Sequence, residues 1–213
     1  MTGKWKTQSA RGLVFDFGGV ITACASPVKV KAIVDRLGLP WQAVLDGYAK
    51  YRREYDLGDI TIAEFYDRTW RAAGVSVPPA ARAEMEEADT ASFLSRNDRT
   101  VGWLRSLKAR GFALGILTNM PRELAPRFKA GFADVLSLVD ALVVSCEEHV
   151  VKPMREIYDL AAARIGLPAG ELVFFDDSEA NCEGARAAGW RAIRFAGNDQ
   201  AEADLERLLG AGG

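Results

Sequence analysis

Residues 13–22 read Leu-Val-Phe-Asp-Phe-Gly-Gly-Val-Ile-Thr, an apolar and β-prone run that is interrupted by one carboxylate and two glycines. A short continuous apolar run of this kind predicts a strand buried on both faces of a parallel sheet. Asp16 then stands at the carboxyl end of that strand, where open α/β sheets bind ligands. Gly18 and Gly19 allow a sharp turn and a close approach of a ligand to the main chain. Asp16 alone could equally begin a turn, so its interpretation depends on later stretches.

The composition of the 213-residue chain bounds the class of protein. A net charge of −2 argues against nucleic acid as the main partner. No apolar run approaches the roughly 20 residues that span a bilayer, and the N-terminus lacks the apolar core of a signal peptide, so we expect a cytoplasmic protein without a membrane partner. Cys24, Cys146 and Cys182 match no metal-binding spacing and are expected to be buried free thiols. The single histidine, His149, excludes sites built from several histidines.

Residues 23–97 have the pattern of consecutive helices without a strand. Apolar residues recur at helical spacing between Val30 and Leu37. Thr61 and Glu64 have the spacing of a capping box at the start of a further helix. An apolar stripe on that helix, expected to form the core of a small bundle, comprises Ile62, Phe65, Tyr66 and Trp70. A solvated acidic face is expected from Glu84, Glu86, Glu87 and Asp89.

From residue 98 onward, strand and helix patterns alternate. Buried strands are predicted at 112–117, 141–145, 172–175 and 191–195, with helices between them. Asp98 is expected to cap the first of these helices, and Pro121 suits the first turn of the next. Repeated strand–helix units predict an α/β fold with a doubly wound, Rossmann-like parallel sheet. We therefore expect a core domain made of residues 1–22 and 98–213 and an inserted all-helical cap domain made of residues 23–97.

Four polar clusters fall at the predicted carboxyl edge of this sheet. They are Asp16, Thr118-Asn119, Lys152 and Asp176-Asp177. Each has a plain structural reading: a helix cap, a surface lysine or a turn. Their coincidence at the ligand-binding edge of one sheet instead indicates a site.

This set of side chains suits phosphoryl transfer. A phosphate monoester repels a carboxylate nucleophile, and Mg²⁺, which prefers carboxylate and carbonyl oxygens, removes that obstacle. Asp16, an acid from Asp176-Asp177 and the Gly18 carbonyl can hold the metal, while Lys152 supplies a fixed positive charge. The Thr118 hydroxyl and the Asn119 N–H, at a predicted helix N-terminus, can bind the phosphoryl oxygens. Asp16 would attack phosphorus in line and form an aspartyl-phosphate that water then hydrolyses.

The sequence resembles the haloacid dehalogenase (HAD) superfamily, in its subclass with a helical cap after the first motif. The similarity covers nearly the whole chain and is carried by Phe15–Val20, Leu117–Asn119, Lys152-Pro153 with Ile157-Tyr158, and Phe174–Ser178 continuing through Asn181 to Gly189. The resemblance implies that Asp16 is the nucleophile, Asp177 a direct metal ligand and Asp176 a second ligand. It also implies a sheet with the first strand at its centre.

One position departs from the pattern of most phosphatases in this family. They carry an acid–base Asp two residues after the nucleophile, where this chain has Gly18. A subgroup with glycine there resembles sugar-phosphate phosphatases and the N-terminal domains of some epoxide hydrolases. The glycine argues against a phosphomutase, and Asp176-Asp177 argue against a haloalkanoate dehalogenase, which needs no magnesium. Candidates to replace the acid are His149, Glu147 and Glu148, although each has the setting of a loop residue.

Two functions from different classes follow from these features. The first is a Mg²⁺-dependent phosphatase of small phosphorylated metabolites, with sugar phosphates favoured. The second is a catalytically feeble HAD-fold protein that binds a phosphorylated ligand for regulation or interaction, which Gly18 favours. A polar tail of the substrate could meet Arg52, Arg53 or Arg122, although the simpler expectation for each is solvated surface. The sequence carries no signal for the oligomeric state.

Overall fold

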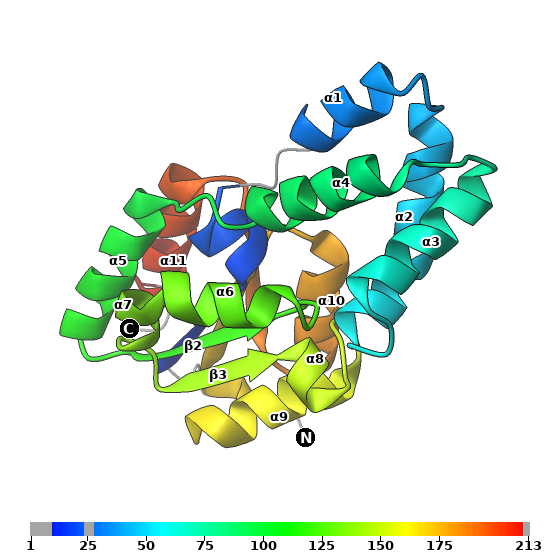
Figure 1. Cartoon of the computed structure of the whole chain (residues 1–213). Helices are drawn as coiled ribbons and strands as arrows, with labels where there is room; N and C mark the ends of the chain where they lie inside the picture. The colour runs from blue at the N-terminus through cyan, green and yellow to red at the C-terminus, as the bar shows by residue number, and fades with distance from the viewer. Residues whose placement is uncertain (1–9, 24–27, 211–213) are drawn as a thin grey trace.

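The chain folds as a parallel five-stranded sheet covered by helices, and the computed structural model describes residues 10–23 and 28–210 (Figure 1). The strands, in spatial order, are β3 (Ala141–Val144), β2 (Ala113–Thr118), β1 (Gly12–Phe15), β4 (Leu172–Asp176) and β5 (Arg191–Arg194). All four strand pairings are parallel. The predicted α/β class and the central position of the first strand are therefore confirmed.

Both faces of the sheet are buried, as the apolar run in β1 predicts. Leu13 and Phe15 point into one apolar cluster and Val14 into another. The first face is covered by α5 (Asp98–Ala109), α6 (Leu124–Gly131), α7 (Ala133–Leu136) and α11 (Asn198–Gly210). The second is covered by α9 (Arg155–Ile165) and α10 (Glu179–Ala187), while the short α8 (Ser145–Glu148) follows β3. The sheet is thus doubly wound, and its carboxyl edge stays available for a site.

Four helices lie between β1 and α5 and gather beside the sheet (Figure 1). After an irregular turn at Phe17–Ile21 they are α1 (Val28–Arg36), α2 (Trp41–Asp56), α3 (Ile62–Ala73) and α4 (Pro79–Ser92). They share an apolar cluster of their own, which includes Val34, Phe65, Tyr66, Trp70 and Met85. The capping box is present, because the Thr61 hydroxyl accepts from the Glu64 N–H and the Glu64 carboxylate accepts from the Thr61 N–H. The helical character predicted for this stretch is confirmed, and these four helices are called the cap below.

Several local predictions need correction. Asn97, not Asp98, caps α5, since the Asn97 side chain accepts from the Thr100 N–H. Asp89 was expected on a solvated face but is buried, because its turn of α4 faces Tyr48 of α2. Pro121 was expected in the first turn of the helix after β2, but that helix, α6, begins only at Leu124.

Two of the three cysteines can be placed. Cys146 and Cys182 are buried free thiols, as predicted, whereas Cys24 lies outside the described residues. Within residues 10–23 and 28–210, none of the helices combines the length and apolarity needed to cross a bilayer.

Candidate active site

Asp16 directly follows β1 and is fixed by the backbone around it. Its N–H continues the sheet by donating to the Phe175 carbonyl at 2.8 Å. The carboxylate Oδ1 accepts from the Phe17 N–H at 2.7 Å. The residue is 8% exposed, so its carboxylate meets solvent only through the cavity described below. Strand pairing and this turn together hold the side chain at the carboxyl edge of the sheet.

Lys152 joins the two carboxylates that follow the central strands. Its Nζ lies 2.9 Å from Asp16 Oδ1 and 2.6 Å from Asp176 Oδ2, in a buried position. Burial alone would lower the pKa of Lys152, but the two carboxylates outweigh it and hold this pKa above its usual value. Asp176 is held in turn by the Ser178 N–H at 2.8 Å and by the Asn181 side chain at 3.0 Å. Lys152 therefore stands between two carboxyl groups whose positions are fixed by the backbone and side chains around them.

Three carboxylates form a group suited to a divalent cation. Oxygens of Asp16, Asp176 and Asp177 lie within 4.8 Å of one another. Burial raises the pKa of Asp16 to about 7, with Lys152 opposing and Asp176 reinforcing the shift. Burial, reinforced by Asp176, also raises the pKa of Asp177. Three acids beside one lysine leave uncompensated negative charge, and this all-oxygen donor set fits Mg²⁺.

The two glycines after Asp16 have different roles in the turn. Gly19 has φ = 72°, and a Cβ at this position would collide with the Asp177 carboxylate. Glycine is therefore required there for both conformation and space. Gly18 has φ = −67° and ψ = 130°, and a Cβ would meet no atom within 4 Å. A side chain at position 18 would thus enter the open cavity.

Thr118 and Asn119 follow β2 and differ in what they contact. Thr118 is buried and lines the cavity beside Asp16. The Asn119 amide clasps the backbone of Lys152: its Nδ2 donates to the Lys152 carbonyl at 3.0 Å, and its Oδ1 accepts from the Lys152 N–H at 2.8 Å. The expected helix N-terminus at Asn119 was wrong, because α6 begins five residues later. The Asn119 side chain is bonded to the backbone of Lys152, and the residue still lines the cavity.

These groups surround a cavity of about 220 Å³ whose far wall comes from the cap. Asp16, Gly18, Thr118, Asn119 and Asp177 line the sheet side, whereas Arg52, Asp56 and Phe93 line the cap side. Arg52 and Asp56 form an ion pair one helical turn apart on α2, with 2.9 Å between Nη2 and Oδ1. The expectation that Arg52 is merely solvated surface was wrong. The i, i+4 spacing of the pair was visible in the sequence, but the face that it occupies was not.

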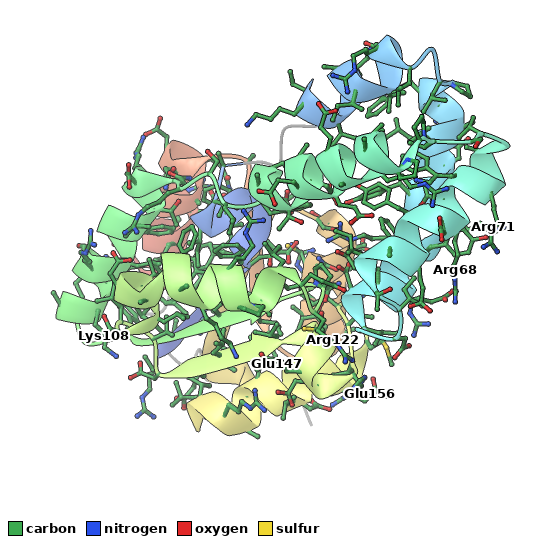
Figure 2. All side chains as sticks on the ribbon, in the orientation of Figure 1. Arg68, Arg71, Lys108, Arg122, Glu147 and Glu156 are labelled. Atoms are coloured by element: carbon green, nitrogen blue, oxygen red, sulfur yellow. The ribbon has the colours of Figure 1, made fainter. Side chains whose placement is uncertain are left out.

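The other arginines and the proposed replacement acids lie elsewhere. Arg53 contacts Met154 Sδ. Arg122, labelled in Figure 2, donates to the carbonyl of Gly58 at 2.8 Å, in the loop between α2 and α3. None of the three suggested acids lines the cavity. Their partners are Lys129 for Glu147 (labelled in Figure 2), Arg164 for Glu148 and Asp59 for His149.

Comparison with known proteins decides the family. The family model for haloacid dehalogenase-like hydrolases matches residues 10–189, which is most of the chain. The chain belongs to this family. It is therefore an enzyme of the hydrolase class, and the resemblance to the HAD superfamily that the sequence showed is confirmed.

Curated relatives of this HAD-like hydrolase include several named phosphatases. It is 26% identical to Phosphatase MT3486 of Mycobacterium tuberculosis over 190 residues, which cover 87% of each chain. It is 27% identical to the phosphoglycolate phosphatase of Pectobacterium atrosepticum, over 86% of this chain and 79% of the relative. It is 24% identical to the sesquiterpene phosphatase astK of Aspergillus oryzae, over 94% and 97%. The relatives thus share a hydrolase class but differ in the substrates that their names state.

Among solved structures, a HAD family enzyme from Bacteroides thetaiotaomicron shares the fold. The TM-score is 0.69 at 21% identity, over 92% of this chain and 99% of the other. A second crystal structure of that enzyme, described as a complex with magnesium and inorganic phosphate, has a TM-score of 0.67 and 21% identity over 91% and 98%.

Proposed function

We propose that this HAD-like hydrolase is a Mg²⁺-dependent phosphatase of small phosphomonoesters, with Asp16 as its nucleophile. The observation that carries the proposal is the buried chain of charged groups from Asp16 through Lys152 to Asp176, in which Asp16 lines the cavity. Asp16 Oδ1 accepts both of the contacts given above, from Phe17 and Lys152. The other oxygen, Oδ2, is then the one that attacks phosphorus.

In the first step, an Asp16 oxygen forms a bond to phosphorus while the bond from phosphorus to the alcohol oxygen breaks, and that oxygen takes its proton from water. In the second, water attacks phosphorus, phosphate leaves and the Asp16 carboxylate is regenerated. Lys152 stabilises the negative charge on the transferred group in both steps. Thr118, whose hydroxyl makes only a long contact of 3.4 Å with the Asn119 carbonyl, can bind a phosphoryl oxygen. Asn119 acts through Lys152, whose backbone it holds.

The proposed metal ligands are Asp16, Asp177, Asp176 and the Gly18 carbonyl. Bound Mg²⁺ would neutralise charge between the phosphate ester and the Asp16 carboxylate. The clustering of three acids and the raised pKa of Asp16 and Asp177 support this assignment. A further support is that the Bacteroides enzyme, which has a similar fold, was crystallised in complex with magnesium and inorganic phosphate.

The substrate class and setting remain parts of the proposal. The resemblance favours sugar phosphates, and a cytoplasmic phosphorylated metabolite is the kind of partner expected from the sequence. A feeble enzyme that binds a phosphate ester for regulation is the second candidate function. Gly18 is the observation that favours it, because no side chain at this position can protonate the leaving alcohol.

Phosphate release from a metabolite panel, with Mg²⁺ or with a chelator, tests the proposal. We expect turnover by the wild type with Mg²⁺, and loss of nearly all turnover in Asp16→Asn with an unchanged fold. Asp159→Asn, which alters an exposed carboxylate on α9, is the matched control and should keep wild-type rates. Saturable binding of phosphate esters without Asp16-dependent turnover would establish the second candidate instead.

A further inference from the structure

A second cavity, of about 210 Å³, lies within the cap. Most of its wall is apolar or aromatic and comes from Trp41, Val44, Leu45, Tyr48, Tyr66 and Phe93. Its acidic group is Asp89, which lies under the Tyr48 hydroxyl at 3.3 Å. Phe93 lines both this cavity and the catalytic one, so the two are neighbours.

One face of α2 runs along both cavities. Trp41, Leu45, Tyr48, Arg52 and Asp56 succeed one another at intervals of three or four residues and so share a face of the helix. The first three line the apolar cavity, and the last two line the catalytic cavity. At 1.5 Å per residue, Tyr48 and Asp56 are about 12 Å apart along the axis. The two cavities therefore follow one another along α2, with the side chains of Arg52, Tyr48 and Phe93 between them.

Arg52 is the basic side chain among the described residues that line the two cavities, and its guanidinium is already paired. Arg52 pairs with Asp56 and donates to the Tyr48 hydroxyl, which itself donates to Asp89. Arg52 is thus already engaged by Asp56 and by the Tyr48 hydroxyl. The Arg52 guanidinium also stacks over the rings of Phe93, at 5.2 Å, and Tyr48, at 5.5 Å. A carboxylate or second phosphate on the substrate would therefore find no unpaired partner at this wall.

We propose that the cap cavity binds the alcohol part of the substrate, and that the enzyme prefers phosphate monoesters of apolar alcohols over carboxylate-bearing ones and over the sugar phosphates that the family resemblance favours. This inference rests on the proposed phosphatase function. The cavity exceeds the roughly 150 Å³ that accommodates benzene but is smaller than the roughly 300–1,000 Å³ of drug-sized sites. The occupant is thus the size of an aryl ring or an alkyl chain of about six carbons.

The test compares n-hexyl phosphate with 6-hydroxyhexyl phosphate and 5-carboxypentyl phosphate. All three are primary alkyl esters, so the absence of an acid at Gly18 affects them equally. The Asp89 carboxylate already accepts from the Tyr48 hydroxyl, so a terminal hydroxyl of the substrate would be buried without a free partner, at a cost of about 1–3 kcal/mol. The value of kcat/KM should therefore be about 5-fold or more higher for the hexyl ester than for the hydroxyhexyl ester. The carboxypentyl ester should be the poorest substrate. Equal kcat/KM for the hexyl and hydroxyhexyl esters would overturn the inference.

Two variants of Leu45 and a control locate the preference. Leu45→Asn should lower kcat/KM for n-hexyl phosphate about 10-fold, and Leu45→Trp, which fills the cavity, should do the same. Both should leave methyl phosphate, which is too short to reach the cavity, at its wild-type rate. Val28→Asn changes a more exposed apolar side chain on α1 and should alter neither substrate. Equal losses on hexyl and methyl phosphate in the Leu45 variants would refute the assignment.

Failure of the inference can be distinguished from failure of the proposed function. If the enzyme hydrolyses methyl phosphate in a reaction that depends on Asp16 but does not prefer the hexyl ester, only the inference about the cap cavity is refuted. If no ester is turned over, the proposed function is refuted. The binding of esters to the cap cavity is then measured by calorimetry. Wild-type protein should bind n-hexyl phosphate about 10-fold more tightly than 6-hydroxyhexyl phosphate, and Leu45→Asn should abolish that difference. Equal affinities in the wild type would reject the cavity as a binding site.

Discussion

Replacing Gly18 by aspartate should add the proton-transfer group that this chain lacks. The backbone permits the change, because φ is −67° and the added Cβ would enter open space. General acid–base assistance is typically worth about 10²–10⁴-fold, or about 3–5 kcal/mol of barrier. The wild type should therefore hydrolyse aryl phosphates, whose leaving groups depart readily as anions, faster than alkyl phosphates. We also expect an initial burst of alcohol release, since no side chain at position 18 activates water for the second step.

The gain in Gly18→Asp should appear on alkyl phosphates and be small on aryl phosphates. We expect an increase in alkyl turnover toward the lower end of that range, about 10²-fold, because the new carboxylate joins three others and its own pKa will not be optimal. Gly18→Asn adds nearly the same shape without a proton to transfer and should give no gain. Gly19→Ala, in contrast, should lose both activity and stability, since φ is 72° and the Asp177 carboxylate occupies the space of its Cβ.

Pre-steady-state release of phosphate and alcohol, measured for aryl and alkyl esters on all four proteins, distinguishes these effects. Equal wild-type rates on aryl and alkyl esters, without a burst, would mean that another group already supplies the proton. Asp56 would then be the first residue to replace, because its carboxylate stands on the cap side of the same cavity. An equal gain from Gly18→Asn would also refute the reasoning, since it would assign the effect to backbone conformation.

Three further predictions concern the metal, the buried acid and the positioning of Lys152. Asp177→Asn should raise the Mg²⁺ concentration needed for activity, and Asp176→Asn should raise it less. Mg²⁺ should also raise the wild-type Tm, because it binds the folded state. A calorimetric titration without a binding signal, together with activity that survives a chelator, would exclude the metal. Because burial raises the pKa of Asp16 to about 7, the folded metal-free protein keeps a proton that the unfolded chain loses near pH 4. Wild-type stability relative to Asp16→Asn should therefore fall as pH rises from about 4 to about 7, and a flat difference in denaturant titrations with chelator would contradict this. Asn119→Ala should lower the free energy of unfolding by about 1–3 kcal/mol, because the buried N–H and carbonyl of Lys152 lose their partners; an unchanged urea midpoint would show that the clasp contributes nothing.

The sheet and the catalytic groups beside it could be predicted because they depend on local pattern and on one rule of topology. Apolar runs identify the strands, and parallel strands all end at one edge. Asp16, Thr118 and Asp176 therefore had to approach one another, and the structure places them there. Lys152 follows β3 only after α8, and its ion pairs with Asp16 and Asp176 bring it to the same edge. Their chemical roles stay predictions until they are tested.

The cap wall could not be predicted, because it depends on how one helix is rotated relative to the sheet. Arg52 and Asp89 have the composition of solvated surface, yet Asp89 is buried beside Tyr48 and Arg52 is partly covered by its contacts with Asp56, Tyr48 and Phe93. The role of Asn119 was missed for a similar reason. Its partner is a backbone 33 positions away, and no local pattern signals that contact.

The two ends of the cap segment meet in space, which bears on how such an insertion can be exchanged. Thr22 and Arg96 form an antiparallel bridge, with the Ala23 N–H donating to the Ser95 carbonyl at 2.7 Å and the Asn97 N–H donating to the Ile21 carbonyl at 3.0 Å. The chain thus leaves and re-enters the sheet layer through something like the stem of a hairpin. A short turn could close that stem, and a loop or helical unit of another size could be grafted onto it without altering the strand register. Modular exchange at one stem gives evolution, and protein engineering, a route to new selectivity that leaves the phosphate-binding edge intact.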